Sequence, residues 1–117
     1  MYVIGGFNHE EHICDKVERF CWESKVWESL EPINIPRING SATKCGMKYV
    51  YLFGGLSSQR NEFSDQIERY NTELQIWTVL SIRLPLKLSN SFAFSFSDEF
   101  ILIMGGITKK EPTAMTS

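Results

Sequence analysis

The stretch "YLFGGLSSQRNEFSDQIERYNTELQIW", Tyr51 to Trp77, decides the fold, because the chain carries nearly the same pattern at its start. That earlier copy reads "YVIGGFNHEEHICDKVERFCWESKVW", Tyr2 to Trp27. A third copy begins at "ILIMGG", which ends at Gly106. Repetition at a fixed spacing is the sequence signature of repeat architectures. The pattern therefore indicates the architecture of the chain more directly than its biological task.

Each copy is a short apolar run that ends in a pair of glycines. The doublets, 49 and 51 residues apart, are Gly5-Gly6, Gly54-Gly55 and Gly105-Gly106. In the first two copies a polar loop then leads to "KVERF" or "QIERY". An aromatic residue is followed seven positions later by tryptophan in the pairs Phe20 and Trp27, and Tyr70 and Trp77. A period of about 50 residues is the spacing given for kelch propeller blades.

From Met1 to about Ile107 the chain resembles kelch repeats, in which a strand, a glycine pair, a variable loop and an aromatic strand precede tryptophan. The segment "IPRINGSATKCGMKYVYLFGG" resembles the first half of such a repeat. The resemblance implies an all-β fold of antiparallel four-stranded kelch blades in a partial β-propeller. One blade is expected to be complete, and two are expected to be present in part.

Four units follow from this interpretation. Residues 1–35 are expected to be the C-terminal part of a first blade, 36–85 a complete blade, 86–107 the N-terminal half of a third blade and 108–117 a disordered tail. Nine strands are predicted, near residues 1–4, 16–20, 26–29, 41–45, 48–53, 66–70, 76–80, 91–96 and 100–104. About two blades cannot close a ring, since propellers have typically 4 to 8. We therefore expect a piece of a longer protein, or self-association through open blade edges.

A helical alternative exists for the second copy. Its apolar residues Phe63, Ile67, Tyr70, Leu74 and Trp77 follow the spacing of an amphipathic helix. A strand, a glycine-rich turn and a helix would then imitate a phosphate-binding unit. The first copy argues against it, because a serine replaces the leucine there and interrupts the apolar stripe.

Composition excludes several classes of function. The chain has 117 residues, of which 43% are hydrophobic and 13% aromatic, enough for a packed core. A net charge of −2 without basic clusters argues against nucleic-acid binding. No stretch approaches the roughly 18 apolar residues of a membrane span, and no secretory signal is visible. The odd count of three cysteines favours free thiols and a cytoplasmic location.

Enzymatic activity is not expected from this sequence. Some kelch-like propellers are copper oxidases of the galactose oxidase type, whose chemistry needs clustered His, Tyr and Cys ligands. This chain has only His9 and His12, both in the loop "NHEEHIC", and their spacing fits no metal motif. No cofactor is expected. A fragment of such an enzyme, or a partial gene product without independent function, remains an alternative interpretation.

The resemblance instead implies a protein-interaction module, a scaffold or substrate-recognition element of a larger protein whose partner the sequence does not name. Loops on a rigid scaffold can vary freely and carry recognition. The candidate binding residues are Asn8, Arg37, Ser57, Arg60 and Thr108. The glycine doublets and the aromatic pairs are expected to serve the fold, through permitted backbone conformations and large apolar contacts between blades.

Overall fold

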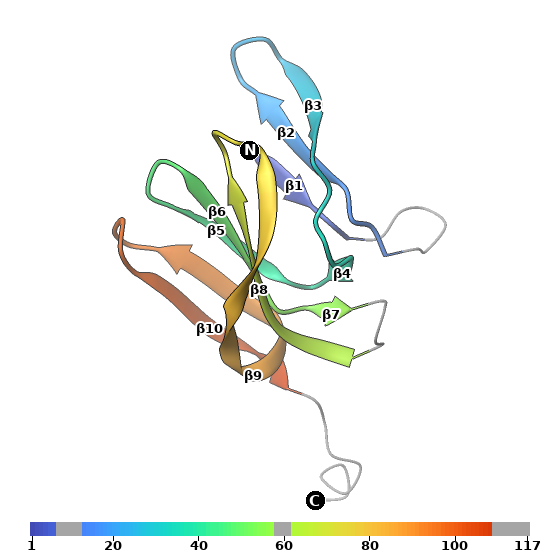
Figure 1. The fold of residues 1–117 in the computed structure, drawn as a ribbon, viewed down its shortest axis with the longest axis vertical. Helices are drawn as coiled ribbons and strands as arrows, with labels where there is room; N and C mark the ends of the chain where they lie inside the picture. The colour runs from blue at the N-terminus through green and yellow to red at the C-terminus, as the bar shows by residue number, and fades with distance from the viewer. Residues whose placement is uncertain (7–12, 58–61, 109–117) are drawn as a thin grey trace, which may run out of the picture.

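A computed structural model describes residues 1–6, 13–57 and 62–108 as an all-β fold without helices (Figure 1). Its strands are β1 (Tyr2–Ile4), β2 (Val17–Cys21), β3 (Val26–Leu30), β4 (Arg37–Ile38), β5 (Ser41–Cys45), β6 (Tyr49–Phe53), β7 (Leu56–Ser57), β8 (Glu62–Asn71), β9 (Ile76–Ser95) and β10 (Ile101–Thr108). Every strand pair is antiparallel. The predicted all-β class is confirmed, and the helical alternative for residues 63–77 is wrong.

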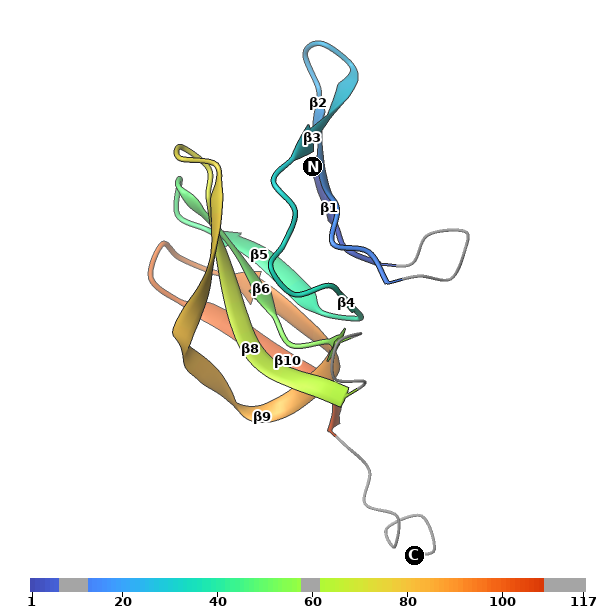
Figure 2. The ribbon, with the colours of Figure 1, turned by 45° about the vertical axis from the view of Figure 1, so that its right-hand side comes forward.

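The strands form three successive units that follow the sequence repeat. Blade 1 is the sheet β1-β2-β3, and blade 2 is β5-β6-β8 with the first part of β9, residues 76–84. Blade 3 is the last part of β9, residues 88–95, paired with β10. Figures 1 and 2 show blade 1 beside blade 2, with β10 on the opposite side of blade 2. The structure therefore contains one four-stranded blade between two incomplete ones.

The repeat is also visible in the backbone. Four residues other than glycine have a positive φ, and they form two equivalent pairs among the described residues, Lys25 with Gln75 and Asn39 with Asn90. Lys25 and Gln75 lie in the turns that follow β2 and β8. Residues other than glycine rarely enter this left-handed region. Equivalent backbone strain in two copies therefore confirms that the same supersecondary unit forms twice.

Strand β9 differs from the prediction. Separate strands were expected near residues 76–80 and 91–96, but β9 runs unbroken for 20 residues from Ile76 to Ser95. Proline within a strand normally removes a ladder hydrogen bond. Pro85 removes no ladder hydrogen bond here, because it lies where the register between β8 and β9 is irregular. The paired residues on either side of it are Arg83, opposite Gln66, and Leu88, opposite Ser64. Strand β9 therefore continues through residues 85 and 86, where the second unit was expected to end and the third to begin. The division of the chain into these units stays a prediction.

Two smaller features were not predicted. The paired short strands β4 and β7 add two strands and the merging of two predicted strands into β9 removes one, so the described residues contain ten strands rather than the predicted nine. Strand β10 continues beyond its glycine doublet to Thr108, opposite Leu88, although residue 108 was expected to begin a disordered tail. Residues 109–117 lie outside the described residues, so that part of the expectation is untested.

The core consists of two apolar layers, one on each side of blade 2. The first contains Val17, Ile33, Val50, Leu52, Tyr70 and Trp77, with Tyr2, Ile4 and Leu30 packed against it. The second contains Phe53, Ile67 and Ala93, with Tyr51, Leu80, Leu84, Ile101 and Ile103 packed against it. Because successive side chains of a strand point to opposite faces, blade 2 can fill both layers at once. The packing between blades thus fixes the blades, and the strand ends at their edges, relative to one another.

Candidate functional site

The five candidate binding residues fall into three groups. Asn8 and Arg60 lie outside the described residues. Arg37 and Ser57 are buried, with 2% and 3% of their surface exposed. Thr108 is exposed at the end of β10. Of the three residues that the structure describes, only Thr108 presents its side chain to solvent.

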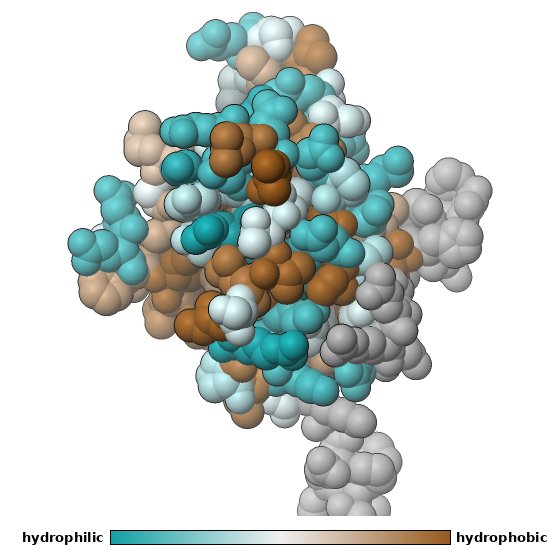
Figure 3. Space-filling model, viewed as in Figure 1, coloured by the Kyte–Doolittle hydropathy of each residue, from teal (hydrophilic) through white to brown (hydrophobic). Residues whose placement is uncertain are grey.

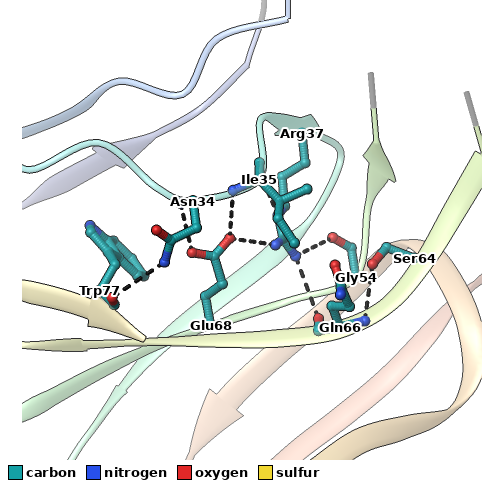
Figure 4. A network of polar contacts seen from close by, with 8 residues as sticks. All are labelled: Asn34, Ile35, Arg37, Gly54, Ser64, Gln66, Glu68 and Trp77. Carbon is teal, nitrogen blue, oxygen red and sulfur yellow. Dashed lines mark hydrogen bonds and ion pairs between the residues drawn. The ribbon is translucent and has the colours of Figure 1, made fainter. Parts of the chain in front are cut away.

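Arg37 is the centre of a buried polar network (Figure 4). Its Nη2 donates to a carboxylate oxygen of Glu68 at 2.6 Å, and both side chains are buried. Its Nη1 donates to the carbonyl oxygens of Gly54 at 2.9 Å and Gln66 at 3.4 Å. Its Nε donates to the carbonyl oxygen of Ile35 at 3.2 Å. The expectation that Arg37 faces a ligand is therefore corrected, because its donors are used within the blade.

Glu68 accepts hydrogen bonds from the main chain as well as from the Arg37 guanidinium. The main-chain N–H groups of Asn34 and Ile35 donate to its two carboxylate oxygens at 2.8 and 3.1 Å. Burial lowers the pKa of the Arg37 guanidinium, and the charge of Glu68 and its hydrogen bond oppose that shift. The network fastens the connection between blades 1 and 2 to the middle strand of blade 2. The sequence offered one signal for it, since "ER" occurs in both copies.

Ser57 is also buried within the fold. It lies in β7, opposite Arg37 on β4 and opposite Glu62 on β8. Its hydroxyl oxygen is buried and has no hydrogen-bond partner among the described residues. Burial removes the Ser57 side chain from any surface that a protein partner could contact. The expectation that Ser57 binds a partner is therefore corrected in the same way as that for Arg37.

Thr108 lies beside a surface cavity that we call the rim cavity. It has a volume of about 520 Å³ and is lined by Phe63, Gly106, Ile107 and Thr108. Ile107 is 54% exposed and is one of many large apolar residues exposed on the strands, and apolar surface is visible between the hydrophilic areas in Figure 3. Phe63 was not predicted as part of a site, because it follows a variable loop. It comes near Thr108 only because its neighbour Ser64 on β8 and Thr108 on β10 both pair with Leu88 on β9. The rim cavity combines an apolar surface with one hydroxyl group.

The two aromatic pairs occupy equivalent ladder positions, but only Tyr70 and Trp77 are buried between blades, since Trp27 is 45% exposed. Phe20 lies opposite Trp27 and Tyr70 opposite Trp77, with ring centroids 5.1 and 5.0 Å apart. The indole N–H of Trp77 donates to the carbonyl oxygen of Glu31 at 2.9 Å. Trp77 therefore contacts the connection from blade 1, and its aromatic ring belongs to the first core layer.

The glycine doublets bring neighbouring blades together. The N–H of Gly55 donates to the carbonyl oxygen of Leu88 at 2.8 Å, and the N–H of Gly6 donates to that of Arg37 at 3.2 Å. A Cβ on Gly54 would lie 2.4 Å from the same Leu88 oxygen, closer than any side chain permits. Gly5, Gly105 and Gly106 share the positive φ of this doublet. The doublets thus allow the backbones of successive blades to approach.

Two further observations concern other classes of function. Among residues 1–6, 13–57 and 62–108, no group of three or more His, Cys, Asp or Glu side chains could hold a metal ion. His9 and His12 lie outside these ranges. The described part of the chain also contains no helix of the length and hydrophobicity that a membrane crossing requires.

The fold and its contacts define the class first: a partial β-propeller whose blades are joined by glycine doublets and inter-blade aromatic residues. Comparison with known families then identifies it. The family described as "Kelch motif" matches residues 1–34 and 48–82, more than half of the chain. The chain belongs to the kelch-motif family. The predicted family is thereby confirmed, and kelch repeats are consistent with a general protein-interaction module.

Two curated relatives from Dictyostelium discoideum are similar to the chain. A RING finger domain and kelch repeat-containing protein is 26% identical over 81 residues, which cover 69% of this chain and 8% of the relative. A kelch repeat-containing protein is 24% identical over 129 residues, covering 91% of this chain and 19% of the relative. The chain thus spans less than a fifth of the length of either relative. Both are named for repeats or a RING finger, and neither for an enzymatic activity.

Proposed function

We propose that this chain is a protein-binding element that contacts its partner at the rim cavity. The observation that carries the proposal is the exposed apolar surface of Ile107 beside the Thr108 hydroxyl and Phe63. Protein-binding surfaces combine buried apolar anchors with a polar surround. The second core layer holds blades 2 and 3 together, so that this surface is presented with little conformational freedom.

The proposal extends to a role within a larger protein. One relative is named for a RING finger domain together with its kelch repeats. We propose by analogy that the blades of this chain select a partner, while another part of a longer polypeptide acts on it. No observation favours the alternative of a propeller enzyme. Three free cysteines, Cys14, Cys21 and Cys45, support a reducing, cytoplasmic location, which imaging of a fluorescent fusion would test.

Binding at the rim cavity is tested by Ile107→Glu with Ile82→Glu as its matched control. Both isoleucines are exposed, 54% and 66%, but Ile82 lies on β9 and does not line the rim cavity. Proteins labelled by proximity to the wild-type chain in cells would be quantified for each variant. We expect Ile107→Glu to abolish labelling of at least one partner that Ile82→Glu retains. The proposal is wrong if the two variants label the same proteins equally while their unfolding midpoints match that of the wild type.

A further inference from the structure

The link between β4 and β5 contains Asn39-Gly40, and Asn39 is the one asparagine in the chain that a glycine follows. In such a pair the main-chain nitrogen of the glycine can attack the carboxamide carbon of the asparagine side chain. Glycine permits this attack better than other residues, because it has no side chain to shield its nitrogen or to restrict its backbone. The pair is therefore chemically labile wherever the local structure leaves both reacting groups accessible.

The fold itself requires both residues of this pair. Asn39 has a φ of 58°, in the left-handed region that asparagine enters more readily than most residues. A Cβ on Gly40 would lie 3.2 Å from the carbonyl oxygen of Phe53 and 3.3 Å from that of Gly54, which is closer than most side chains tolerate. Two separate structural demands thus place glycine directly after asparagine in this link.

Both reacting groups lack hydrogen-bond partners in the described part of the chain. Asn39 is exposed, and its carboxamide makes no hydrogen bond with the residues that the structure describes. The N–H of Gly40 also has no acceptor within residues 1–6, 13–57 and 62–108. A Cβ on Gly55 would lie 2.9 Å from the Gly40 nitrogen, so glycine at residue 55 keeps that side of the nitrogen open. The attack on the Asn39 side chain therefore breaks no hydrogen bond of the described structure.

Asn90 provides a comparison within the same chain. It is exposed, it is equivalent to Asn39 in the repeat, and its φ of 61° is almost the same. Its Oδ1, however, accepts a hydrogen bond from the Ser89 hydroxyl at 2.7 Å, and the residue that follows it is Ser91 rather than glycine. Asn90 therefore shares the φ of Asn39 without the features that make Asn39 reactive.

We propose that Asn39 is a site of spontaneous deamidation, at which the folded chain converts asparagine to aspartate and isoaspartate with water as the co-reactant. The Gly40 nitrogen forms a bond to Cγ of Asn39, the bond between Cγ and Nδ2 breaks, and ammonia leaves with the Gly40 amide proton. Water then opens the resulting cyclic imide. Attack of water at Cγ gives aspartate, and attack at the main-chain carbonyl carbon gives isoaspartate.

Isoaspartate at residue 39 disturbs the junction of blades 2 and 3. The carbonyl oxygen of Asn39 accepts the Asn90 N–H at 2.8 Å. In isoaspartate this carbonyl group becomes a free carboxylate, and the main chain runs instead through the former side chain, which lengthens it by one methylene group. The acceptor for the Asn90 N–H is thereby displaced, and the chain gains a negative charge. The modification therefore weakens the contact between the two blades, and this inference does not depend on binding at the rim cavity.

The test compares the folded 117-residue chain in mildly alkaline buffer with the same chain in concentrated urea. After incubation, trypsin releases residues 38–44, "INGSATK", which contain Asn39 alone, and residues 88–109, which contain Asn90 alone. Digestion in water enriched in oxygen-18 marks any deamidation that occurs after the incubation. Methylation by an isoaspartate-specific methyltransferase distinguishes isoaspartate from aspartate. Asn39→Gly keeps the left-handed φ without a carboxamide and should show no methylation at this site.

We expect isoaspartate at residue 39 while Asn90 is still unmodified. The folded rate should lie within about tenfold of the rate in urea, because an exposed link needs only local opening. If Asn39 reacts only after global unfolding, the folded rate should be lower by about a thousandfold or more, and that result would overturn the proposal. Equal rates at Asn39 and Asn90 in the folded chain, or no reaction at either residue, would also overturn it.

The effect on the blades is measured on the isoaspartate form after chromatographic separation. Loss of one main-chain hydrogen bond should lower its urea midpoint by about 0.5 M. Asn39→Asp carries the same charge on an unaltered main chain, so its midpoint should stay within about 0.25 M of the wild type. A midpoint of the isoaspartate form equal to that of Asn39→Asp would overturn the proposed effect on the junction of blades 2 and 3.

Discussion

The sharpest consequence of the structure concerns the buried pair of Arg37 and Glu68. Arg37→Met removes the guanidinium and leaves a buried carboxylate without its counter-charge, and the Gly54 and Gln66 carbonyl oxygens lose a donor. Breaking one partner of a buried ion pair costs about 3–5 kcal/mol of the free energy of unfolding. A domain of this size has a total stability of roughly 6–15 kcal/mol, so this loss is a large part of the whole.

The assay is urea unfolding of the 117-residue chain, followed by tryptophan fluorescence. With a denaturant dependence of about 2 kcal/mol per molar urea, a loss of about 4 kcal/mol lowers the midpoint by about 2 M. Arg37→Lys should fall between Arg37→Met and the wild type, because lysine keeps the charge but lacks the planar fork that reaches four acceptors. Glu68→Gln should resemble Arg37→Met, since Glu68 also accepts from Asn34 and Ile35.

The repeat supplies the control for this experiment. Glu18 occupies the equivalent position in blade 1 but is exposed, so Glu18→Gln should change the free energy of unfolding by no more than about 0.5 kcal/mol. The double variant of Arg37→Met and Glu68→Gln should lose less than the sum of the two single variants, by about 0.5–3 kcal/mol. The reasoning is refuted if Glu68→Gln and Glu18→Gln have the same midpoint, or if the two single losses add fully.

Two further predictions use the same unfolding assay. Gly54→Ala places a methyl group 2.4 Å from the Leu88 carbonyl oxygen and should prevent stable packing of blades 2 and 3. Gly105→Ala, where a Cβ would have nothing within 4 Å, should lower the free energy of unfolding by only about 1–2 kcal/mol through backbone strain. Equal losses of stability in the two variants would contradict this prediction. Tyr70→Phe removes a buried hydroxyl that has no partner in the described part of the chain, so stability near pH 7 should hold or rise by about 1 kcal/mol. Burial raises the pKa of the Tyr70 phenol above its ordinary value of 10.0, so the wild type should lose stability above about pH 10 more steeply than Tyr70→Phe, and parallel pH profiles would refute that.

The blades could be predicted from the sequence because each repeated residue has the same local structural role in every copy. Glycine doublets, the aromatic-tryptophan pairs and alternating apolar residues each specify a turn, a ladder position or a buried face. Ser41–Cys45 was predicted with its observed bounds, since small residues lie between clear turn signals. Such features need no knowledge of distant parts of the chain.

The roles of Arg37 and Phe63 depended on contacts that no local pattern describes. Arg37 resembles a ligand-facing residue in its repeat, but Glu68, 31 residues further along, takes up its charge. Phe63 reaches the rim cavity only because β9 passes from blade 2 into blade 3 and carries β10 with it. The continuity of β9 from residue 76 to residue 95 was not predicted either, and proline at residue 85 is uncommon in the middle of a sheet.

The central claim is that successive repeats fold into blades that pack side by side, so that equivalent residues meet. The Oγ atoms of Ser41 and Ser91, at equivalent positions in blades 2 and 3, lie 2.9 Å apart. In a background without the three native cysteines, Ser41→Cys combined with Ser91→Cys should therefore form an intramolecular disulfide on mild oxidation. The account predicts a faster-migrating monomer in non-reducing electrophoresis that reverts with reductant. Free thiols, or only intermolecular dimers, in a folded chain would contradict it.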